Sequence, residues 1–317
     1  MVGEGRPPAP LGQPGSHRGV HSGWRSGVQE RGTIGRMADE AAGQADEQWQ
    51  LHGDAAELYQ RHLVPAVTAG WAAELVERAG LRRGERVLDV ACGTGAVARA
   101  AAGRVGRAGH VAGVDINAAM LAVARSLPAG PGAAVGWLEA SALGLPFRAG
   151  SYDVVLCQLG LQFMPDRPAA LAGMRRVLVP GGRLGLSVYG PIEHHPAAFA
   201  LAGALDRHLG PGASAAKRAE HALADPALLR ALAVGAGFSA VQVVTATRII
   251  RFASAAGYVR IQLAATPLAN LLRHHAEESI RQLAQAITAD VAAARPARRA
   301  DSGLVFPQEA HVLLARA

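Results

Sequence analysis

The stretch VLDVACGTG, from Val87 to Gly95, decides how the rest of the sequence is interpreted. Its apolar first half predicts a buried strand, and its second half predicts a glycine-rich turn that opens a helix over Ala96–Val105. In an open α/β sheet, ligands bind beyond the carboxyl ends of the strands, at such a turn. Asp89 lies within this strand, just before the turn, where a carboxylate would repel a phosphate. The stretch therefore favours a ligand that carries positive charge.

Strand and helix patterns alternate along the chain around this stretch. Five apolar runs predict strands over Arg86–Val90, His110–Asp115, Ala134–Leu138, Tyr152–Cys157 and Arg183–Val188. Asn117 and Asp166 are expected to cap two of the intervening helices. Continuous apolar strands fit a sheet that is covered on both faces, and the alternation fits parallel connections. We expect an α/β fold: a doubly wound, Rossmann-like, seven-stranded sheet, mostly parallel with an antiparallel edge strand and with helices on both faces.

The two remaining strands are expected near the end of the chain. Ala240–Phe252 and Gly303–Ala315 have strand patterns and are expected to pair antiparallel at one edge of the sheet. Among the helices, the pattern over Asp54–Gly80 is expected to be broken by Pro65. The pattern over Asn270–Ala294 predicts one long helix, either continuous or interrupted.

Composition limits the partners. The formal charge is +7 and the pI about 10.3, yet the basic residues are scattered and aromatic residues make up only 4% of the chain. A nucleic-acid groove needs clustered charge and stacking rings, so no nucleic-acid partner is expected. No apolar run is long enough for a membrane span. Cys92 and Cys157 cannot build a disulfide framework or a metal cluster, so we expect a cytoplasmic protein without a metal site. A homodimer is an open alternative to a monomer.

The glycine turn admits two nucleoside ligands. Gly93–Ala98 fits the dinucleotide pattern G-x-G-x-x-G/A, but NAD would place a pyrophosphate close to Asp89. S-adenosylmethionine carries an ammonium and a sulfonium instead, which suits a carboxylate. Asp115 lies 22 residues beyond Gly93 and can accept both ribose hydroxyls in either case. Met120 would face the adenine or belong to the helix core.

Five motifs in order resemble those of class I S-adenosylmethionine-dependent methyltransferases. They are VLDVACGTG, GVDIN, WLEASALGLPF, SYDVVLCQLGLQF and RRVLVPGGRLGLSVY, and the resemblance is strong from Asp54 to Tyr189. Within that class, the small-molecule branch that includes the ubiquinone/menaquinone methyltransferases is the most similar. The first 36 residues are rich in Gly, Pro, Arg and Ser and have no apolar period, so we expect a disordered tail over 1–45, with Met37 as the natural start. The resemblance implies residues 46–317 as the methyltransferase domain. It divides into a helical cover (46–80), a cofactor-binding core (81–190), an acceptor lid (191–300) and a last edge strand (301–317).

The resemblance also implies roles for individual residues that contact the cofactor. Asp89, Gly93 and Gly95 would hold the methionine part, with backbone from Ala91 and Cys92. Asp115 would bind the ribose and Ile116 the adenine. Ser141 stands where the family often has an acid, so it would bind the adenine amino group more weakly, or the main chain of Ala142 would do so. Cys157 and Gln158 would border the transferred methyl group, and Tyr59 would cover the cofactor.

The acceptor is expected to be a small, largely apolar molecule that is methylated on carbon or oxygen. Gln158 and Gln162 can orient it, and His194 or His195 can deprotonate a phenol or enol, although both also suit a surface loop. Tyr258 and Gln262 are expected on a helix that caps the pocket. Two alternatives stay open: an NAD(P)-dependent oxidoreductase and a non-catalytic, cofactor-binding regulatory protein.

Overall fold

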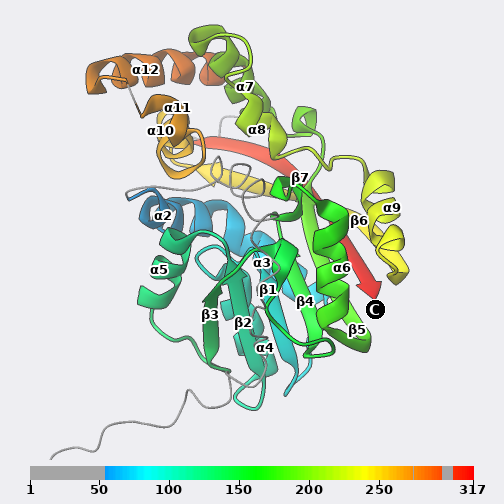
Figure 1. Cartoon of the computed structure of the whole chain (residues 1–317). Helices are drawn as coiled ribbons and strands as arrows, with labels where there is room; N and C mark the ends of the chain where they lie inside the picture. The colour runs from blue at the N-terminus through cyan, green and yellow to red at the C-terminus, as the bar shows by residue number, and fades with distance from the viewer. Residues whose placement is uncertain (1–53, 274, 295–302) are drawn as a thin grey trace, which may run out of the picture.

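The computed structural model describes residues 54–273, 275–294 and 303–317 (Figure 1). The expected disordered tail, the expected start at Met37 and the first residues of the helical cover lie outside the described residues. The described chain forms a central sheet with helices on both faces and a further layer of helices beyond one end of the sheet (Figure 1).

The sheet has seven strands in the order β3-β2-β1-β4-β5-β7-β6. The strands are β1 (Arg86–Val90), β2 (His110–Asp115), β3 (Val135–Glu139), β4 (Tyr152–Gln158), β5 (Leu178–Tyr189), β6 (Ser239–Phe252) and β7 (Leu304–Arg316). Strands β1 to β5 pair in parallel. The expected fold class is thus confirmed, and several strand bounds agree to the residue. The order reverses between β1 and β4, which is where an open sheet of this type leaves a crevice.

The last two strands pair antiparallel with each other, as expected. However, β7 does not form the edge. It lies between β5 and β6 and runs antiparallel to both, so β6 is the edge strand. The reason is apolar content: β7 buries Ala310, Val312 and Leu313, whereas β6 alternates between buried and exposed side chains. The more apolar strand takes the position that is paired on both sides.

Helices cover both faces of the sheet through two separate apolar clusters. On one face, α6 (Arg167–Val177) and α9 (Pro226–Gly235) pack against side chains such as Leu88 and Val155. On the other face, α3 (Ala69–Arg78) and α4 (Ala96–Val105) pack against Val87, Val154 and Leu156. Successive residues of a strand point to opposite faces, so β1 sends Val87 to one cluster and Leu88 to the other.

The N-terminal helix continues through Pro65 instead of breaking there. Helix α2 (Ala55–Leu58) leads into a π-helix, η2 (Tyr59–Thr68), which contains Pro65 and continues into α3. The expected break is wrong because the wider π turn tolerates the missing N–H of proline. Four residues of this π-helix line the cavity described below: Tyr59, Leu63, Val67 and Thr68.

A layer of helices covers the end of the sheet from which the cavity opens (Figure 1). It contains α7 (Pro196–Leu209), α8 (Ala215–Ala219), α10 (Ala255–Ala265), α11 (Ala269–Leu272) and α12 (Glu277–Ala293). Of the two forms expected over 270–294, the interrupted one is observed, as α11 and α12. The far ends of β6 and β7 extend into this layer, where Phe252 and Phe306 pack against Tyr258 of α10. The long antiparallel pair thus connects the layer to the sheet.

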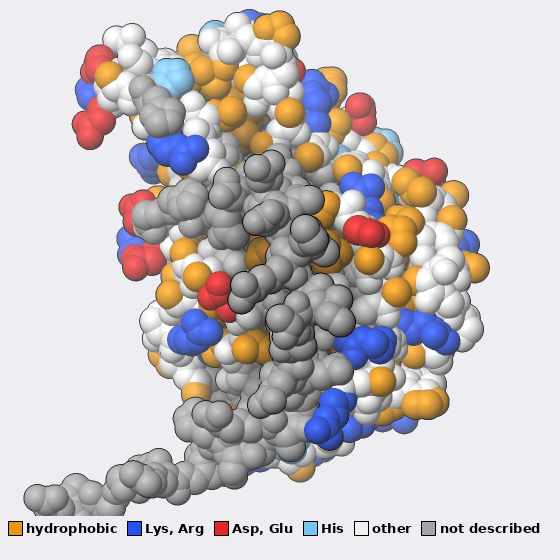
Figure 2. Space-filling view, viewed as in Figure 1, with side chains coloured by type: hydrophobic (Ala, Val, Ile, Leu, Met, Phe, Trp, Pro, Cys, Tyr) orange, Lys and Arg blue, Asp and Glu red, His pale blue; other side chains and the backbone are white. Residues whose placement is uncertain are grey.

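Basic side chains are spread over the surface. Figure 2 shows Lys and Arg in several separate places on the face in view. Several arginines are paired with acids, including Arg86 with Asp153 and Arg183 with Glu85. Among the described residues, no helix is long and apolar enough to cross a membrane.

Candidate active site

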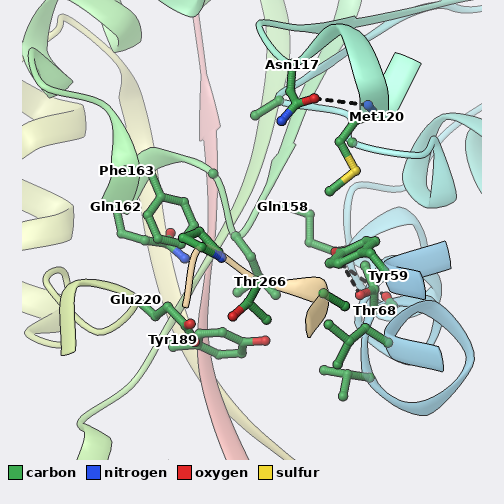
Figure 3. A pocket seen from close by; sticks show the side chains of 18 of the residues that line it. Tyr59, Thr68, Asn117, Met120, Gln158, Gln162, Phe163, Tyr189, Glu220 and Thr266 are labelled. Atoms are coloured by element: carbon green, nitrogen blue, oxygen red, sulfur yellow. Dashed lines mark hydrogen bonds between the residues drawn. The ribbon is translucent and has the colours of Figure 1, made fainter. Parts of the chain in front are cut away.

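A cavity of about 310 Å³ lies at the carboxyl ends of the central strands, between the sheet and the helical layer (Figure 3). Its wall includes residues that follow β1, β2, β3, β4 and β5, together with residues of η2, α8 and α10. This volume is within the range of small-molecule sites, and the position is the one that an open α/β sheet offers to ligands.

The turn after β1 is held in left-handed backbone conformations. The φ angles are +57° at Ala91, +54° at Gly93 and +89° at Gly95. Ala91 and Gly93 line the cavity, so a ligand can contact their main chain. Gly95 does not line it. A Cβ on Gly95 would lie 2.2 Å from the Trp137 ring, so this glycine is required for packing under the turn. The expected contact of Gly95 with the cofactor has no support in this geometry.

Gly95→Ala is expected to reduce the free energy of unfolding more than Gly93→Ala does. Both variants force alanine into a left-handed conformation, at a cost of about 1–2 kcal/mol. Only Gly95→Ala also overpacks against Trp137, which adds about 1–3 kcal/mol. A Cβ on Gly93 meets nothing within 4 Å, so Gly93→Ala is the matched control. Urea unfolding of both variants measures the difference, and equal losses would contradict the assigned role of Gly95.

Asp115 connects the turns that follow β1 and β2. Its Oδ2 accepts from the Gly93 N–H at 2.7 Å, and its Oδ1 accepts from the Asn117 N–H at 2.9 Å. Burial raises the pKa of Asp115, and these backbone donors oppose the rise. The carboxylate lines the cavity, as the sequence predicts. Each carboxylate oxygen has a second lone pair, so ribose hydroxyls can still donate to it.

Asp89 lies in the sheet beside the turn and not in the cavity wall. Its side chain is 1% exposed, and its Oδ2 accepts from the Ala98 N–H of α4 at 2.9 Å. Within the described part of the chain, its buried Oδ1 has no hydrogen-bond partner. Burial, with a smaller contribution from Asp115, raises its pKa well above the ordinary value of 3.8. The carboxylate is thus a buried acceptor with one oxygen available.

The residues that the sequence predicts to contact the adenine come together in the cavity wall. Ile116, Met120, Ser141 and Ala142 line the cavity. Asn117 lines it too, although the sequence assigned it only a capping role. Its Oδ1 accepts from the N–H groups of Ala119 and Met120 and fixes the start of α5 (Ala118–Ser126) against the cavity (Figure 3). These residues follow β2 and β3 at short spacings, which is why sequence motifs could locate them.

The centre of the cavity is formed by Tyr59, Thr68 and Gln158 (Figure 3). The Tyr59 hydroxyl lies 3.1 Å from Thr68 Oγ1, and Gln158 Nε2 donates to the Thr68 carbonyl. Gln158 Oε1 is buried and has no partner among the described residues, and the same is true of both side-chain atoms of Gln162. Two amides that line the cavity therefore keep unused hydrogen-bonding capacity for a bound molecule.

Both cysteines lie outside the cavity wall. Cys157 belongs to β4 and its side chain is fully buried in the core, and Cys92 belongs to the turn after β1 and is 8% exposed. Burial raises the pKa of Cys157 to about 12, so the thiol stays neutral. The expected contact of the Cys157 side chain with the transferred methyl group is not supported, because alternate residues of a strand point away from each other and Gln158 takes that place.

The two predicted histidines occupy different environments. The side chain of His194 is 57% exposed, pairs with Glu309 and does not line the cavity. His195 lines it and is 1% exposed. The Glu309 N–H donates to His195 Nε2 at 3.2 Å. Burial, assisted by the neighbouring His221, lowers the pKa of His195 to about 3. His195 is therefore neutral, with its Nε2 lone pair already used, and neither histidine is placed as the base that the sequence suggested.

Three ionisable residues of the cavity were not predicted: Lys217, Glu220 and His221. They lie on α8 and the turn after it. Lys217 is 3% exposed, and its Nζ donates to the Glu220 carboxylate and, at 2.6 Å, to Gln262 Oε1. One sequence signal existed: Lys217 is the single lysine of an arginine-rich chain. The expected positions of Tyr258 and Gln262 at the pocket are confirmed.

Aromatic side chains gather at the cavity. Three of the four tyrosines and three of the six phenylalanines of the chain line it: Tyr59, Tyr189, Tyr258, Phe163, Phe252 and Phe306. In a chain that is only 4% aromatic, this concentration marks a surface for a planar or apolar ligand.

The strand order, the glycine turn after β1, the acid after β2 and the cavity between them define a class I methyltransferase domain. Residues 87–182 match the model of the methyltransferase domain family.

The relatives agree over the same region. The chain is 41% identical over 116 residues to the ubiquinone/menaquinone biosynthesis C-methyltransferase UbiE of Hahella chejuensis. The aligned region covers 36% of this chain and 47% of that protein. It is 43% identical over 114 residues to the UbiE of Paraburkholderia phymatum, with the same coverage of 36% and 47%. The chain thus spans about half the length of the curated relatives it matches.

The fold is shared with a solved structure over a larger part of the chain. The YcgJ protein of Bacillus subtilis is 19% identical, with a TM-score of 0.51, and the alignment covers 78% of this chain and 98% of that one. At this identity the likeness concerns the fold alone.

Proposed function

We propose that the protein transfers a methyl group from S-adenosylmethionine to a carbon or oxygen atom of a small, largely apolar molecule. One observation carries the proposal: a single cavity joins a nucleoside end, built on Gly93 and Asp115, to an end lined by aromatic rings. The family match and the two C-methyltransferase relatives support the same reaction.

The residues that line the cavity fit this cofactor. Asp115 would accept the ribose hydroxyls, Ile116 and Met120 would border the adenine, and the main chain of Ala91 and Gly93 would contact the methionine part. Asp89 lies next to the cavity wall and not in it, and its buried Oδ1 has no partner among the described residues; the cofactor's ammonium would be a donor of the right charge for this oxygen. Ser141 Oγ accepts from the Leu143 N–H and keeps a second lone pair, with which it would accept from the adenine amino group.

When bound, S-adenosylmethionine supplies a methyl group that is already activated by its positive sulfur. The protein then has to orient the acceptor and exclude water. Gln158 and Gln162 would orient a polar group of the acceptor through their unused amide atoms. The aromatic rings and the helical layer would exclude water, and Tyr59 would cover the cofactor.

The oxidoreductase alternative is disfavoured by charge. Asp89 is an acid beside the turn where NAD would place its pyrophosphate, whereas Asp115 suits the ribose of either ligand. A non-catalytic regulator would also bind the cofactor, but it would not need the polar side chains of Lys217, Glu220 and His221 in the cavity wall. Both alternatives predict a different result in the following measurement.

Calorimetric titration with S-adenosylhomocysteine and with NADH tests the proposal. We expect saturable binding of S-adenosylhomocysteine and no binding of NADH. Labelled S-adenosylmethionine, incubated with the protein and a small-molecule extract of cells, should then label a compound of low molecular mass. Binding of NADH in place of S-adenosylhomocysteine would refute the cofactor assignment, and binding without any labelled product would favour the regulator.

The partners and location belong to the same proposal. The spread of Lys and Arg over the surface supports a small-molecule acceptor over nucleic acid (Figure 2). We also propose a cytoplasmic location, which two buried, free cysteines suit. Exposed Val244 and Ile249 on the edge strand β6 support a homodimer as the alternative to a monomer.

A further inference from the structure

The turn after α8 brings a third histidine, His221, into the acceptor end of the cavity. It lines the wall and is 7% exposed. The Tyr189 ring stacks on it with centroids 5.4 Å apart, and the His195 ring meets it edge-on at 4.5 Å. Packing on two sides fixes the plane of the imidazole, which is a requirement for a group that exchanges a proton with a ligand.

The hydrogen bond of His221 determines its tautomer. Its Nδ1 lies 2.7 Å from the carbonyl oxygen of Gly190. A carbonyl can only accept, so Nδ1 carries the proton and Nε2 of the neutral ring keeps its lone pair. In the described ranges of the chain, no side chain or backbone group donates to Nε2. The ring is thus oriented by one nitrogen and available through the other.

The charged neighbours suit the same role. The buried Lys217 and the partly buried Glu220 form an ion pair beside His221, and Glu193 and His195 lie nearby. Burial lowers the pKa of His221, so the ring is neutral near neutral pH. The Gly190 carbonyl and Glu220 act in the opposite direction and would stabilise an imidazolium once it forms. Lys217 limits that stabilisation and favours return of the proton to solvent.

We propose that His221 Nε2 accepts the hydroxyl proton of the methyl acceptor, and this inference rests on the proposed function. The O–H bond of a phenol or enol breaks and an N–H bond forms on Nε2. The oxygen, or the carbon conjugated with it, forms a bond to the methyl group. The methyl–sulfur bond breaks and leaves its electron pair on sulfur, which gives S-adenosylhomocysteine. Charge is conserved, because the positive charge of the sulfonium ends on the imidazolium.

The test uses the full chain loaded with S-adenosylhomocysteine, and 4-nitrophenol as the probe, because its ionised form absorbs visible light. His221→Gln removes the basic nitrogen but keeps a donor for the Gly190 carbonyl. His110→Gln is the matched control, since His110 is exposed at the start of β2 and does not line the cavity. Nitrogen-15 NMR of histidine-labelled wild-type protein reads the tautomer of His221 without any variant.

We expect Nε2 of His221 to be unprotonated in the free protein and protonated when the probe binds. The ionised fraction of bound probe at about pH 6 should be about tenfold higher in the wild type and in His110→Gln than in His221→Gln. All three proteins should bind S-adenosylhomocysteine equally. A protonated Nε2 in the free protein, a probe that does not bind, or a probe that binds without ionising would overturn the inference. Loss of S-adenosylhomocysteine binding in the wild type would instead refute the proposed function.

Discussion

Asp115→Ala is expected to reduce the affinity for S-adenosylhomocysteine by about a hundredfold or more, because two charge-assisted hydrogen bonds to the ribose are lost. The variant also removes the acceptor of the Gly93 and Asn117 N–H groups, which hold the turns after β1 and β2 in place. Affinity for 5′-methylthioadenosine, which has the same nucleoside but no amino-acid part, should fall by a similar factor. Calorimetry with both ligands measures the effect.

Asp166→Asn is the control for this variant. Asp166 caps α6 outside the cavity, and asparagine caps a helix equally well. Circular dichroism should show that both variants are folded. If Asp115→Ala is folded and binds 5′-methylthioadenosine as tightly as the wild type does, the carboxylate does not hold the ribose.

Asp89→Asn is expected to weaken binding of S-adenosylhomocysteine by about ten- to a hundredfold, from the loss of a charge-assisted bond to its ammonium. Unlike Asp115→Ala, it should leave the affinity for 5′-methylthioadenosine unchanged, because that ligand has no ammonium. The comparison of the two ligands separates a charge effect at Asp89 from a general distortion of the turn. Equal losses for both ligands would show that Asp89 acts only by positioning α4 through the Ala98 N–H.

The same Asp89→Asn variant should be more stable than the wild type when no ligand is bound. The folded-state pKa of Asp89 is raised by burial, so the folded protein holds this proton more tightly than the unfolded chain does. Stability is then lost as the pH rises above the ordinary carboxyl pKa of 3.8, and the loss is complete above the raised value. Asparagine cannot ionise and avoids that loss. Thermal unfolding of both proteins at neutral pH measures the difference, and a lower melting temperature of the variant would contradict it.

The pH dependence of S-adenosylhomocysteine binding follows from the raised pKa of Asp89. Below the raised pKa of Asp89, the carboxyl is protonated and attracts the ammonium only weakly. Wild-type affinity for S-adenosylhomocysteine should therefore increase with pH through this range, and the increase should be smaller in Asp89→Asn. A buried acid that destabilises the free protein and strengthens ligand binding is a common compromise at functional sites.

The cavity residues that we propose to hold the cofactor could be predicted from the sequence because they follow strands at short, fixed spacings. Asp115, Ile116 and Met120 follow β2, and Ser141 and Ala142 follow β3. Once the strands are recognised by their apolar runs, parallel pairing brings these positions to one edge of the sheet. No long-range packing had to be known.

The acceptor half could not be predicted in the same way. His221 lies in a short polar turn that has no periodic pattern, and it reaches the cavity only because α8 packs under α7 and its Nδ1 bonds to Gly190, 31 residues earlier. His194 and His195 are adjacent in the sequence, but the fold exposes one and buries the other.

By itself, the sequence determined the strands of the sheet, their parallel pairing through β5, and the glycine turn after β1, because these depend on local periodicity and on glycine. The tertiary structure decided how segments that are far apart in the chain pack against one another. In the folded protein, β7 lies inside the sheet and Trp137 packs against Gly95. Asp89 is buried outside the cavity wall, whereas the wall includes Lys217, Glu220 and His221. Burial and hydrogen bonding between residues far apart in the chain set these positions and protonation states, and no local pattern encodes them.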